Sequence, residues 1–257
     1  MDSATEPGVI VEQRDRMLVI TINRPKAKNA VNMAVSQGLA DAMDRLDGDP
    51  GLSVAIVTGA GGSFCAGMDL KAFARGERCD IDGRGLGFTE RPPVKPLIAA
   101  VEGYALAGGT EVALATDLIV AARDAAFGIP EVKRGLVAGG GGLLRLPQRI
   151  PYAVAMELAL TGDNFPAVRA HELGLVNVLA EPGGALDAAI VLAEKITANG
   201  PLAVAATKRI IVESRNWSPE EQWKEQIKIL LPAFASKDAQ EGALAFAEKR
   251  RPKWTGT

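Results

Sequence analysis

The sequence predicts an α/β fold, in which buried parallel strands alternate with helices. Three short apolar runs, bounded by glycine-rich or polar turns, predict strands at residues 54–58, 97–101 and 118–121. Runs that are apolar at every position are typical of strands covered on both faces. After Pro151 the pattern changes to helical stretches punctuated by proline and glycine. One core followed by a helical C-terminal region is therefore predicted.

The N-terminal part predicts a hairpin and then a helix. Two β-rich runs, residues 9–13 and 17–23, are separated by a short polar turn. Residues 32–47 carry apolar side chains at the spacing of an amphipathic helix that ends at Gly48. Further along, residues 75–93 are glycine-rich and charged, which predicts a loop or a short helix.

The later elements follow the same reasoning. A helix is predicted from about residue 108 to 115, directly after a glycine-rich turn. The C-terminal part predicts helices over residues 185–198, 202–214 and 220–234, with a last one in EGALAFAEKR.

Composition excludes several classes of protein. The net charge of the 257 residues is -2, and no basic stripe is present, so no nucleic-acid partner is expected. The N-terminus carries acidic residues and lacks the apolar region of a secretion signal. Every apolar stretch is interrupted before the roughly 20 residues of a membrane span. We therefore expect a cytoplasmic protein with no membrane partner.

Metal chemistry is not expected. Cys65 and Cys79 are not spaced like a zinc site, and a disulfide is not expected in a reducing cytosol. The single histidine, His171, excludes HExxH zinc chemistry and sites built from several histidines. Its position predicts a helix-end or capping role, although a Ser-His-Asp triad stays open if His171 is the base. Acid–base work then falls mainly to carboxylates, lysine, tyrosine or cysteine.

Three glycine-rich segments interrupt the globular pattern, at residues 59–71, 102–111 and 127–146. None has the spacing of a phosphate-binding P-loop, and the first lacks the third glycine of a dinucleotide fingerprint. Two strand-to-helix turns can instead present backbone N–H groups to one point, as an oxyanion hole does. The alternative is that these turns only connect strands to helices.

Two glutamates accompany these turns. Glu111 lies one turn into an apolar helix, and Glu131 follows Pro130. A carboxylate on an apolar face is costly to bury unless it is paired or used. Glu111 could simply favour the helix dipole, and Glu131 could be a solvated residue partnered by Lys133 or Arg134. Together, beside two donor turns, they predict an acid–base pair next to an anion site.

Five ordered motifs resemble the crotonase (enoyl-CoA hydratase/isomerase) superfamily, over nearly the whole chain. They are NRPKAKNAV at 23–31, SFCAGMDLK at 63–71, KPLIAAVEGYALAGGTEVALATDLIVAA at 95–122, FGIPEVKRGL at 127–136 and GGLLRLP at 141–147. The tail, EGALAFAEKRRPKWTGT, resembles the carnitinyl-CoA dehydratase branch.

The resemblance implies a fold and a set of site residues. Residues 1–200 would form a spiral of ββα units, and residues 201–257 a helical region that assembles a homotrimer or a dimer of trimers. The site would take an acyl-CoA thioester and need no cofactor, since CoA is part of the substrate. Matched by motif, Glu111 and Glu131 would be the catalytic acids, and the N–H groups of Met68 and Gly108 the oxyanion hole. Substrate and CoA contacts would come from Arg24, Lys26, Ala27, Lys28, Ala66, Asp69, Leu70, Lys71, Gly109, Pro130 and Gly139, and from Phe246 and Lys249 of this subunit or a neighbour.

The implied reaction is addition of water across the 2,3 double bond of a 2-enoyl-CoA, because both glutamates are present. Carnitinyl-CoA dehydratase-like or enoyl-CoA isomerase activity is the alternative, and an acyl-CoA-binding or RNA-binding role is the non-enzyme alternative. Two positions depart from the family pattern: Ala107 begins what is usually a run of three glycines, and Ala138 replaces a common proline. Both concern the acyl pocket rather than the fold.

Overall fold

A six-stranded sheet forms the centre of the core. The computed structural model describes residues 7–257, so the first six residues, part of the segment in which no secretion signal is predicted, lie outside the described residues. The strand order is β1-β2-β3-β4-β6-β9, and only β1 is antiparallel to its neighbour. The strands are Val9–Arg14, Met17–Ile22, Val54–Gly59, Leu97–Val101, Leu118–Ala122 and Val178–Ala180. The predicted hairpin, the three predicted buried strands and the α/β fold class are confirmed.

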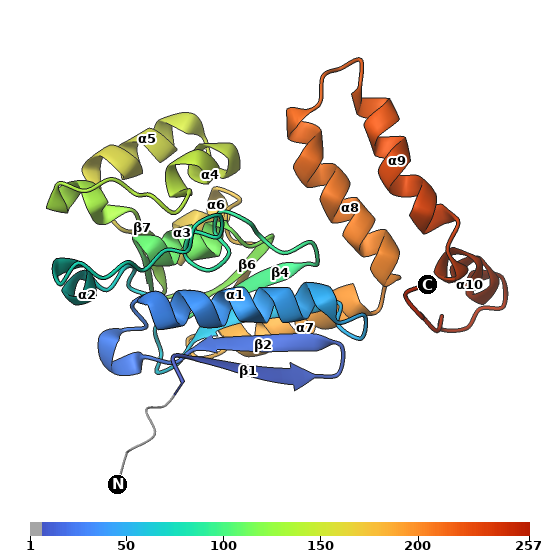
Figure 1. The fold of residues 1–257 in the computed structure, drawn as a ribbon, viewed down its shortest axis with the longest axis horizontal. Coiled ribbons are helices and arrows are strands. Elements are labelled where there is room, and N and C mark those ends of the chain that lie inside the picture. Colours follow the sequence, from blue (N-terminus) through green and yellow to red (C-terminus); the bar gives the residue numbers. More distant parts are fainter. Residues whose placement is uncertain (1–6) are drawn as a thin grey trace, which may run out of the picture.

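Helices cover both faces of this sheet, which explains why its central strands are apolar throughout (Figure 1). On one face, Leu18 and Ile20 of β2 pack in the same cluster as Leu39 of α1 (Met33–Gly48). On the other face, Met17 packs in a cluster with Ala189 of α7 (Ala185–Thr197). The alternation of neighbouring strand residues between the two clusters follows from the two-residue repeat of a strand. Helix α1 begins as predicted, because the Asn32 side chain accepts a hydrogen bond from the Val35 N–H at 3.1 Å.

A second, three-stranded sheet was not predicted. Its order is β5-β7-β8, formed by Tyr104–Leu106, Ala126–Gly128 and Phe165–Pro166. Strands β5 and β7 run parallel, with Leu106 beside Gly128. Helix α3 (Gly108–Leu114) follows β5, and the short 3-10 helix η2 (Pro130–Arg134) follows β7. Parallel neighbouring strands end at the same edge of a sheet, so α3 and η2 begin side by side at that edge.

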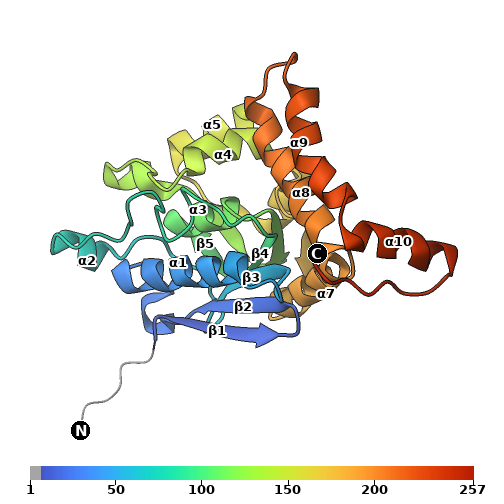
Figure 2. The same cartoon turned by 45° about the vertical axis from the view of Figure 1, so that its right-hand side comes forward.

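The remaining helices lie on two sides of the core. On the left in Figure 1 are α2 (Leu70–Ala74), α4 (Gly142–Arg149) and α5 (Tyr152–Thr161), while α6 (Ala167–Glu172) packs against β7 and β8 of the second sheet. Two more 3-10 turns, η1 (Pro25–Ala27) and η3 (Ser214–Asn216), complete the elements. Helices α8 (Pro201–Glu213), α9 (Gln222–Phe234) and α10 (Lys237–Ala247) extend away from the core on the side opposite α2, as Figures 1 and 2 show. The division into units at residue 200 stays a prediction.

The structure also bears on the expectations for the single histidine, the two cysteines and membrane-spanning helices. The helix-end role of His171 is confirmed, because its Nδ1 lies 2.8 Å from the Val176 carbonyl oxygen just beyond α6. Cys65 and Cys79 are both free thiols. Within residues 7–257 no single helix has the length and apolar character needed to cross a bilayer, and one sharply bent pair, Ala185–Thr197 with Pro201–Asn216, meets those two criteria jointly.

Candidate active site

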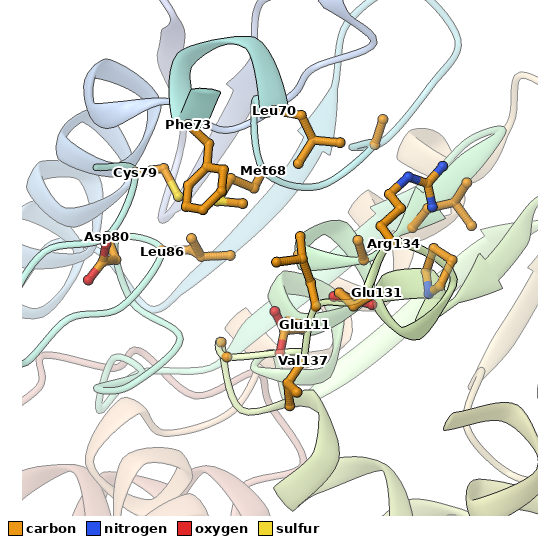
Figure 3. A pocket seen from close by; sticks show the side chains of 18 of the residues that line it. Met68, Leu70, Phe73, Cys79, Asp80, Leu86, Glu111, Glu131, Arg134 and Val137 are labelled. Atoms are coloured by element: carbon orange, nitrogen blue, oxygen red, sulfur yellow. The ribbon is translucent and has the colours of Figure 1, made fainter. Parts of the chain in front are cut away.

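A cavity of about 630 Å³ opens beside α3, between α2 and η2. We call it the central cavity. Most of its wall is apolar, and Figure 3 shows Phe73 and Met68 on one side with Glu111, Glu131 and Val137 across from them. Its size falls in the range of pockets that enclose a small organic ligand. Its apolar lining includes Met68, Leu70, Phe73, Leu86, Leu106, Leu136 and Val137.

Two unpaired backbone N–H groups meet at the wall of the central cavity. Met68 lies in an isolated bridge with Val31, in which the Val31 N–H donates to the Gly67 oxygen and the Asp69 N–H donates to the Val31 oxygen, both at 2.8 Å. The Met68 N–H therefore points the other way. Gly108 is the first residue of α3, where an N–H has no partner in the helix. Neither N–H has an acceptor within residues 7–257.

Glycine allows these two N–H groups to approach each other. Gly67 has a φ of 96°, a conformation that glycine adopts freely. A Cβ added to Gly67 would lie 3.1 Å from the Gly108 nitrogen, and one added to Gly108 would lie 3.5 Å from the Met68 nitrogen. The two amides therefore lie next to each other, so the sequence-predicted pair of donors is brought together.

Ala107 holds this turn in a conformation that costs energy. It precedes α3 with φ 51° and ψ -126°, which a side chain adopts only under strain. Ala107→Gly is expected to raise the free energy of unfolding by about 1 kcal/mol, because relief of the strain exceeds the entropic cost of glycine. Urea denaturation measures this, with Ala113→Gly in the same helix as the matched control, which should lose stability. A less stable Ala107→Gly variant would mean that the methyl contact with Gly67 outweighs the strain.

Glu111 is enclosed by the glycine run 139–142. Its side chain is buried, and its Oε1 accepts a hydrogen bond from the Gly142 N–H at 2.9 Å. A Cβ on Gly140 would lie 2.7 Å from Oε2, so only glycine permits this approach. Burial raises the pKa of Glu111, opposed by the N–H groups of Gly142 and Gly140 and by the charge of Arg145. Glu111 therefore does more than favour the helix dipole, the alternative role considered from the sequence, because its carboxylate is bound by the glycine run.

Glu131 faces the same space, with one carboxyl oxygen left without a hydrogen-bond partner. Its Oε2 is buried and makes no hydrogen bond. Burial is the largest effect on the pKa of Glu131 and raises it, and the nearby negative charge of Glu111 also raises it. A hydrogen bond from its own N–H and the positive charge of Arg134 lower the pKa by less. The alternative of a solvated residue partnered by Lys133 is wrong, because Lys133 pairs with Asp163 at 2.6 Å. Arg134 forms no ion pair with Glu131 either. A buried, unpartnered carboxyl oxygen that faces a cavity is a group available to a ligand.

The central cavity gathers only part of the binding set that the family resemblance implies. Lys28, Ala66, Leu70, Pro130 and Gly139 line it. Arg24, Lys26, Ala27, Asp69 and Lys71 do not. Lys28 reaches toward the mouth, where its Nζ lies 5.5 Å from the ring centroid of Tyr104.

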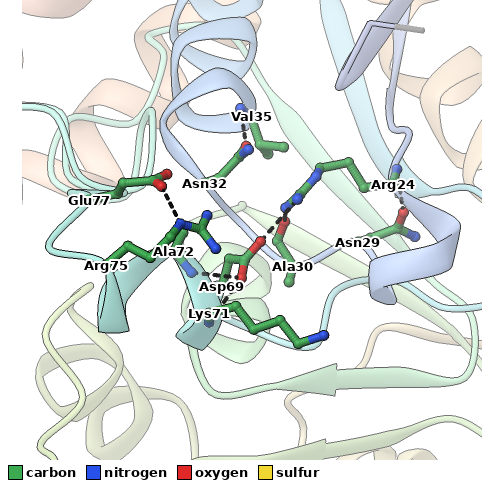
Figure 4. A network of polar contacts seen from close by, with 10 residues as sticks. All are labelled: Arg24, Asn29, Ala30, Asn32, Val35, Asp69, Lys71, Ala72, Arg75 and Glu77. Atoms are coloured by element: carbon green, nitrogen blue, oxygen red, sulfur yellow. Dashed lines mark hydrogen bonds and ion pairs between the residues drawn. The ribbon is translucent and has the colours of Figure 1, made fainter. Parts of the chain in front are cut away.

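Arg24 and Asp69 belong to a network that fixes the neighbouring turns (Figure 4). The Arg24 guanidinium donates to Asp69 Oδ2 at 2.9 Å, and Asp69 Oδ1 caps α2 by accepting from the N–H groups of Lys71 and Ala72. The same guanidinium donates to the Ala30 oxygen. These contacts tie η1 to the segment that carries Met68, so Arg24 and Asp69 support the site from outside the cavity.

Gly109, Phe246 and Lys249 also lie outside the cavity of their own chain. A Cβ on Gly109 would lie 2.0 Å from the Cys65 carbonyl oxygen, so Gly109 packs α3 against the segment before Met68. Phe246 is 88% exposed on α10, and Lys249 follows that helix on the far side of the molecule from α2. Either residue could contact an active site only in a neighbouring subunit.

Several lining residues were missed from the sequence. Leu86, Leu136 and Val137 give the cavity much of its apolar wall. They lie in loops, where no periodic pattern marks an inward face. Gly140 and Gly142 were visible as a run of four glycines, but their contact with Glu111 depends on a pairing 31 residues apart.

Comparisons with known proteins agree with this arrangement. The profile of the enoyl-CoA hydratase/isomerase family matches residues 12–257. Enoyl-CoA hydratase EchA19 of Mycobacterium tuberculosis is 44% identical over 96% of each chain, and carnitinyl-CoA dehydratase of Proteus mirabilis is 43% identical over 95% of this chain and 96% of its own.

Solved structures agree over the same length. An enoyl-CoA hydratase from Mycobacterium tuberculosis H37Rv is 83% identical with a TM-score of 0.97, covering 98% of this chain and 100% of that one. A carnitinyl-CoA hydratase from Mycobacterium avium is 44% identical with a TM-score of 0.79, covering the same shares. The fold expected from the family resemblance is thereby confirmed, and the chain belongs to the enoyl-CoA hydratase/isomerase family, the crotonase superfamily.

Proposed function

We propose that this protein is an enoyl-CoA hydratase, which adds water across the 2,3 double bond of a 2-enoyl-CoA thioester. One observation carries the proposal: the parallel strands β5 and β7 deliver Glu111 and Glu131 to one cavity, beside the free N–H groups of Met68 and Gly108. The name of the structure that is 83% identical supports the same reaction.

The thioester oxygen would accept hydrogen bonds from Met68 and Gly108. Addition of water at C3 moves negative charge onto this oxygen, so donors fixed there stabilise the transition state more than the substrate. The water oxygen bonds to C3, one of its protons passes to Glu111, and the proton of Glu131 passes to C2. The two carboxyls thereby exchange protonation states, and a proton transfer between them or through solvent resets the site.

The surroundings of the two carboxyls support these separate roles. The Glu111 carboxylate accepts the Gly142 N–H and faces Arg145, both of which favour its charged form. Glu131 has a buried oxygen without a donor and faces the negative charge of Glu111. Glu131 is therefore the group that holds the proton when one of the pair is neutral, and the pair titrates as a unit.

Carnitinyl-CoA dehydratase-like activity is the second candidate. It is favoured by the carnitinyl-CoA dehydratase relatives at 42–44% identity, and by the chemistry, because loss of water uses the same groups in reverse. Isomerase activity is less well supported, because moving one proton between carbons does not require a second carboxyl to orient water.

A substrate panel tests the proposal. The purified protein is incubated with crotonyl-CoA, crotonobetainyl-CoA and longer 2-enoyl-CoAs up to steroid-sized acyl groups, and products are identified by mass and by chromatography. A 3-hydroxyacyl-CoA product, heavier than the substrate by the mass of one water molecule, supports hydration. A product of unchanged mass with a shifted double bond would instead support isomerisation, and no product from any substrate would refute both.

The raised pKa of each glutamate predicts the pH profile. We expect log(kcat/KM) to be bell-shaped, falling at low pH as Glu111 is protonated and at high pH as Glu131 loses its proton. Because burial raises both pKa values, both limbs should lie above the range of exposed carboxyls. Stopped assays across pH measure this. In Glu131→Gln the residual activity should lose the high-pH limb, since glutamine does not titrate.

We further propose that the protein is a homotrimer or a dimer of trimers, in which Phe246 and Lys249 approach a neighbour's active site. The exposed apolar side chains of α9 and α10 support an interface there: Trp223 is 68% exposed, Phe234 74% and Phe246 88%. Exposed apolar area of this kind is typical of association surfaces. Light scattering on the full chain tests the stoichiometry, and a monomeric mass would overturn it.

A further inference from the structure

Arg145 connects two loops that both contribute residues to the lining of the central cavity. It lies on α4, and its side chain is partly buried. Its Nη2 donates to the Thr89 carbonyl oxygen and its Nη1 to the Gly140 carbonyl oxygen at 3.4 Å. Thr89 and Gly140 are far apart in the chain, so one guanidinium holds together segments that no sheet or helix joins.

No carboxylate pairs with this cation. Within residues 7–257, Arg145 forms no ion pair. Burial lowers the pKa of Arg145, and the negative charge of Glu111, which faces it, raises that pKa by less. An unpaired charge in a partly buried position costs stability, so its presence calls for a compensating role.

Each of the two loops carries a part of the site. Gly140 belongs to the glycine run 139–142, whose N–H groups hold the Glu111 carboxylate. Thr89 accepts the Leu86 N–H on its Oγ1 at 3.0 Å. The Leu86 side chain lies against Gly108, since a Cβ there would be 2.9 Å from Leu86 Cδ1. Arg145 thus contacts the glycine run that binds the Glu111 carboxylate and the loop that places Leu86 beside Gly108.

We propose that Arg145 is a positioning residue, which clamps the loop around Leu86 and Thr89 to the glycine run 139–142 and so fixes the Glu111 carboxylate relative to the acyl group. The inference rests on the proposed hydratase function. Arg145 does not line the cavity and touches no reacting atom. Its effect passes through Gly140 and Thr89.

The clamp has a consequence for pH dependence. The charged groups that face Glu111 are Arg145 from α4 and Glu131 from η2, with Arg134 beside Glu131. Removing the Arg145 charge removes an interaction that favours the Glu111 carboxylate, so the pKa of Glu111 rises. The low-pH limb of the activity profile should then move to higher pH.

The test compares Arg145→Met, Arg145→Lys and Arg149→Met. Arg149 is the matched control, because it lies one turn further along α4, is also partly buried, and donates to the Thr116 oxygen away from the cavity. Melting curves first establish the folded fraction of each variant. We expect Arg145→Met to lose on the order of 10- to 100-fold in kcat with little change in KM, and to move the low-pH limb upward. Arg145→Lys should keep the limb near its original place while losing part of kcat. Arg149→Met should retain the original kcat and the original position of the low-pH limb.

Two results would overturn the inference. The first is an unmoved low-pH limb in a folded Arg145→Met variant. The second is a loss of kcat no larger than that of Arg149→Met. Adding Arg145→Met to Glu111→Gln should cost little more than Glu111→Gln alone, because the clamp acts through that carboxyl. A carbon-13 carboxyl titration by NMR follows Glu111 without any turnover, so failure of the clamp is distinguishable from failure of the hydratase proposal, which the substrate panel decides.

Discussion

Glu131→Gln is expected to fold, to bind acyl-CoA and to lose roughly two to four orders of magnitude in turnover. Glutamine keeps the size of the side chain but cannot deliver a proton to C2. Glu111→Gln should lose turnover by a similar factor, because the neutral amide cannot take a proton from water. Steady-state hydration of crotonyl-CoA measures kcat and KM, and titration with saturated butyryl-CoA measures binding without turnover.

Stability separates loss of chemistry from loss of fold in these variants. The folded-state pKa of Glu131 is raised above its unfolded value by burial and by Glu111. The folded protein therefore binds this proton more tightly, and its stability falls as the pH rises from the unfolded pKa through the folded one. Glutamine removes that penalty, so Glu131→Gln should melt no lower than the original protein at neutral pH.

A surface carboxyl provides the matched control for the same chemical change. The Glu181 side chain is 82% exposed and pairs with Arg123, so Glu181→Gln should alter neither kcat nor melting by a measurable amount. Near-normal hydration by either Glu111→Gln or Glu131→Gln would remove that residue from the proposed mechanism. Loss of acyl-CoA binding together with turnover would point to a damaged pocket instead.

The main sheet could be predicted because its signals are local. Strands β3, β4 and β6 are continuous apolar runs, and α1 has regular apolar spacing with an asparagine cap. Local signals of this kind depend only on neighbouring residues, so a sequence carries them without knowledge of the fold. The pair Glu111 and Glu131 was found for a related reason, because each stands out as a carboxylate in an apolar or glycine-rich context.

The second sheet could not be predicted, and neither could the geometry it produces. Strands β5 and β7 have three residues each, too few for a periodic signal, and each is recognisable only through its partner. The pairing of Arg24 with Asp69 could not be predicted for the same reason, because the two residues lie 45 positions apart in the sequence. The contact of both residues with CoA, which the motifs imply, stays a prediction. Contacts between distant segments leave no trace in local spacing.

Gly109→Ala is expected to damage both the fold and the site, with the largest effect of any single methyl group added here. The new Cβ would lie 2.0 Å from the Cys65 carbonyl oxygen and 2.8 Å from its carbonyl carbon. Both are backbone atoms, so no side chain can rotate away, and α3 must move from the segment that leads to Met68. We expect a loss of about 1–3 kcal/mol or more in unfolding free energy. Activity should fall on the order of 10²–10³-fold, since the Met68 and Gly108 amides separate.

The neighbouring Gly108 distinguishes displacement of the helix from crowding of the oxyanion hole. A Cβ on Gly108 would be too close only to Leu86 Cδ1, the end of a flexible side chain, at 2.9 Å. Gly108→Ala should therefore remain nearly as stable as the original protein while losing activity, because the methyl lies 3.5 Å from the Met68 nitrogen, where the thioester oxygen would bind. Gly48→Ala, with open space around the added Cβ, controls for the substitution itself. Urea denaturation and hydration assays on all three measure the two effects separately. If Gly109→Ala retained full stability and turnover, α3 would not be fixed against Cys65, and the paired amides could not owe their position to that contact.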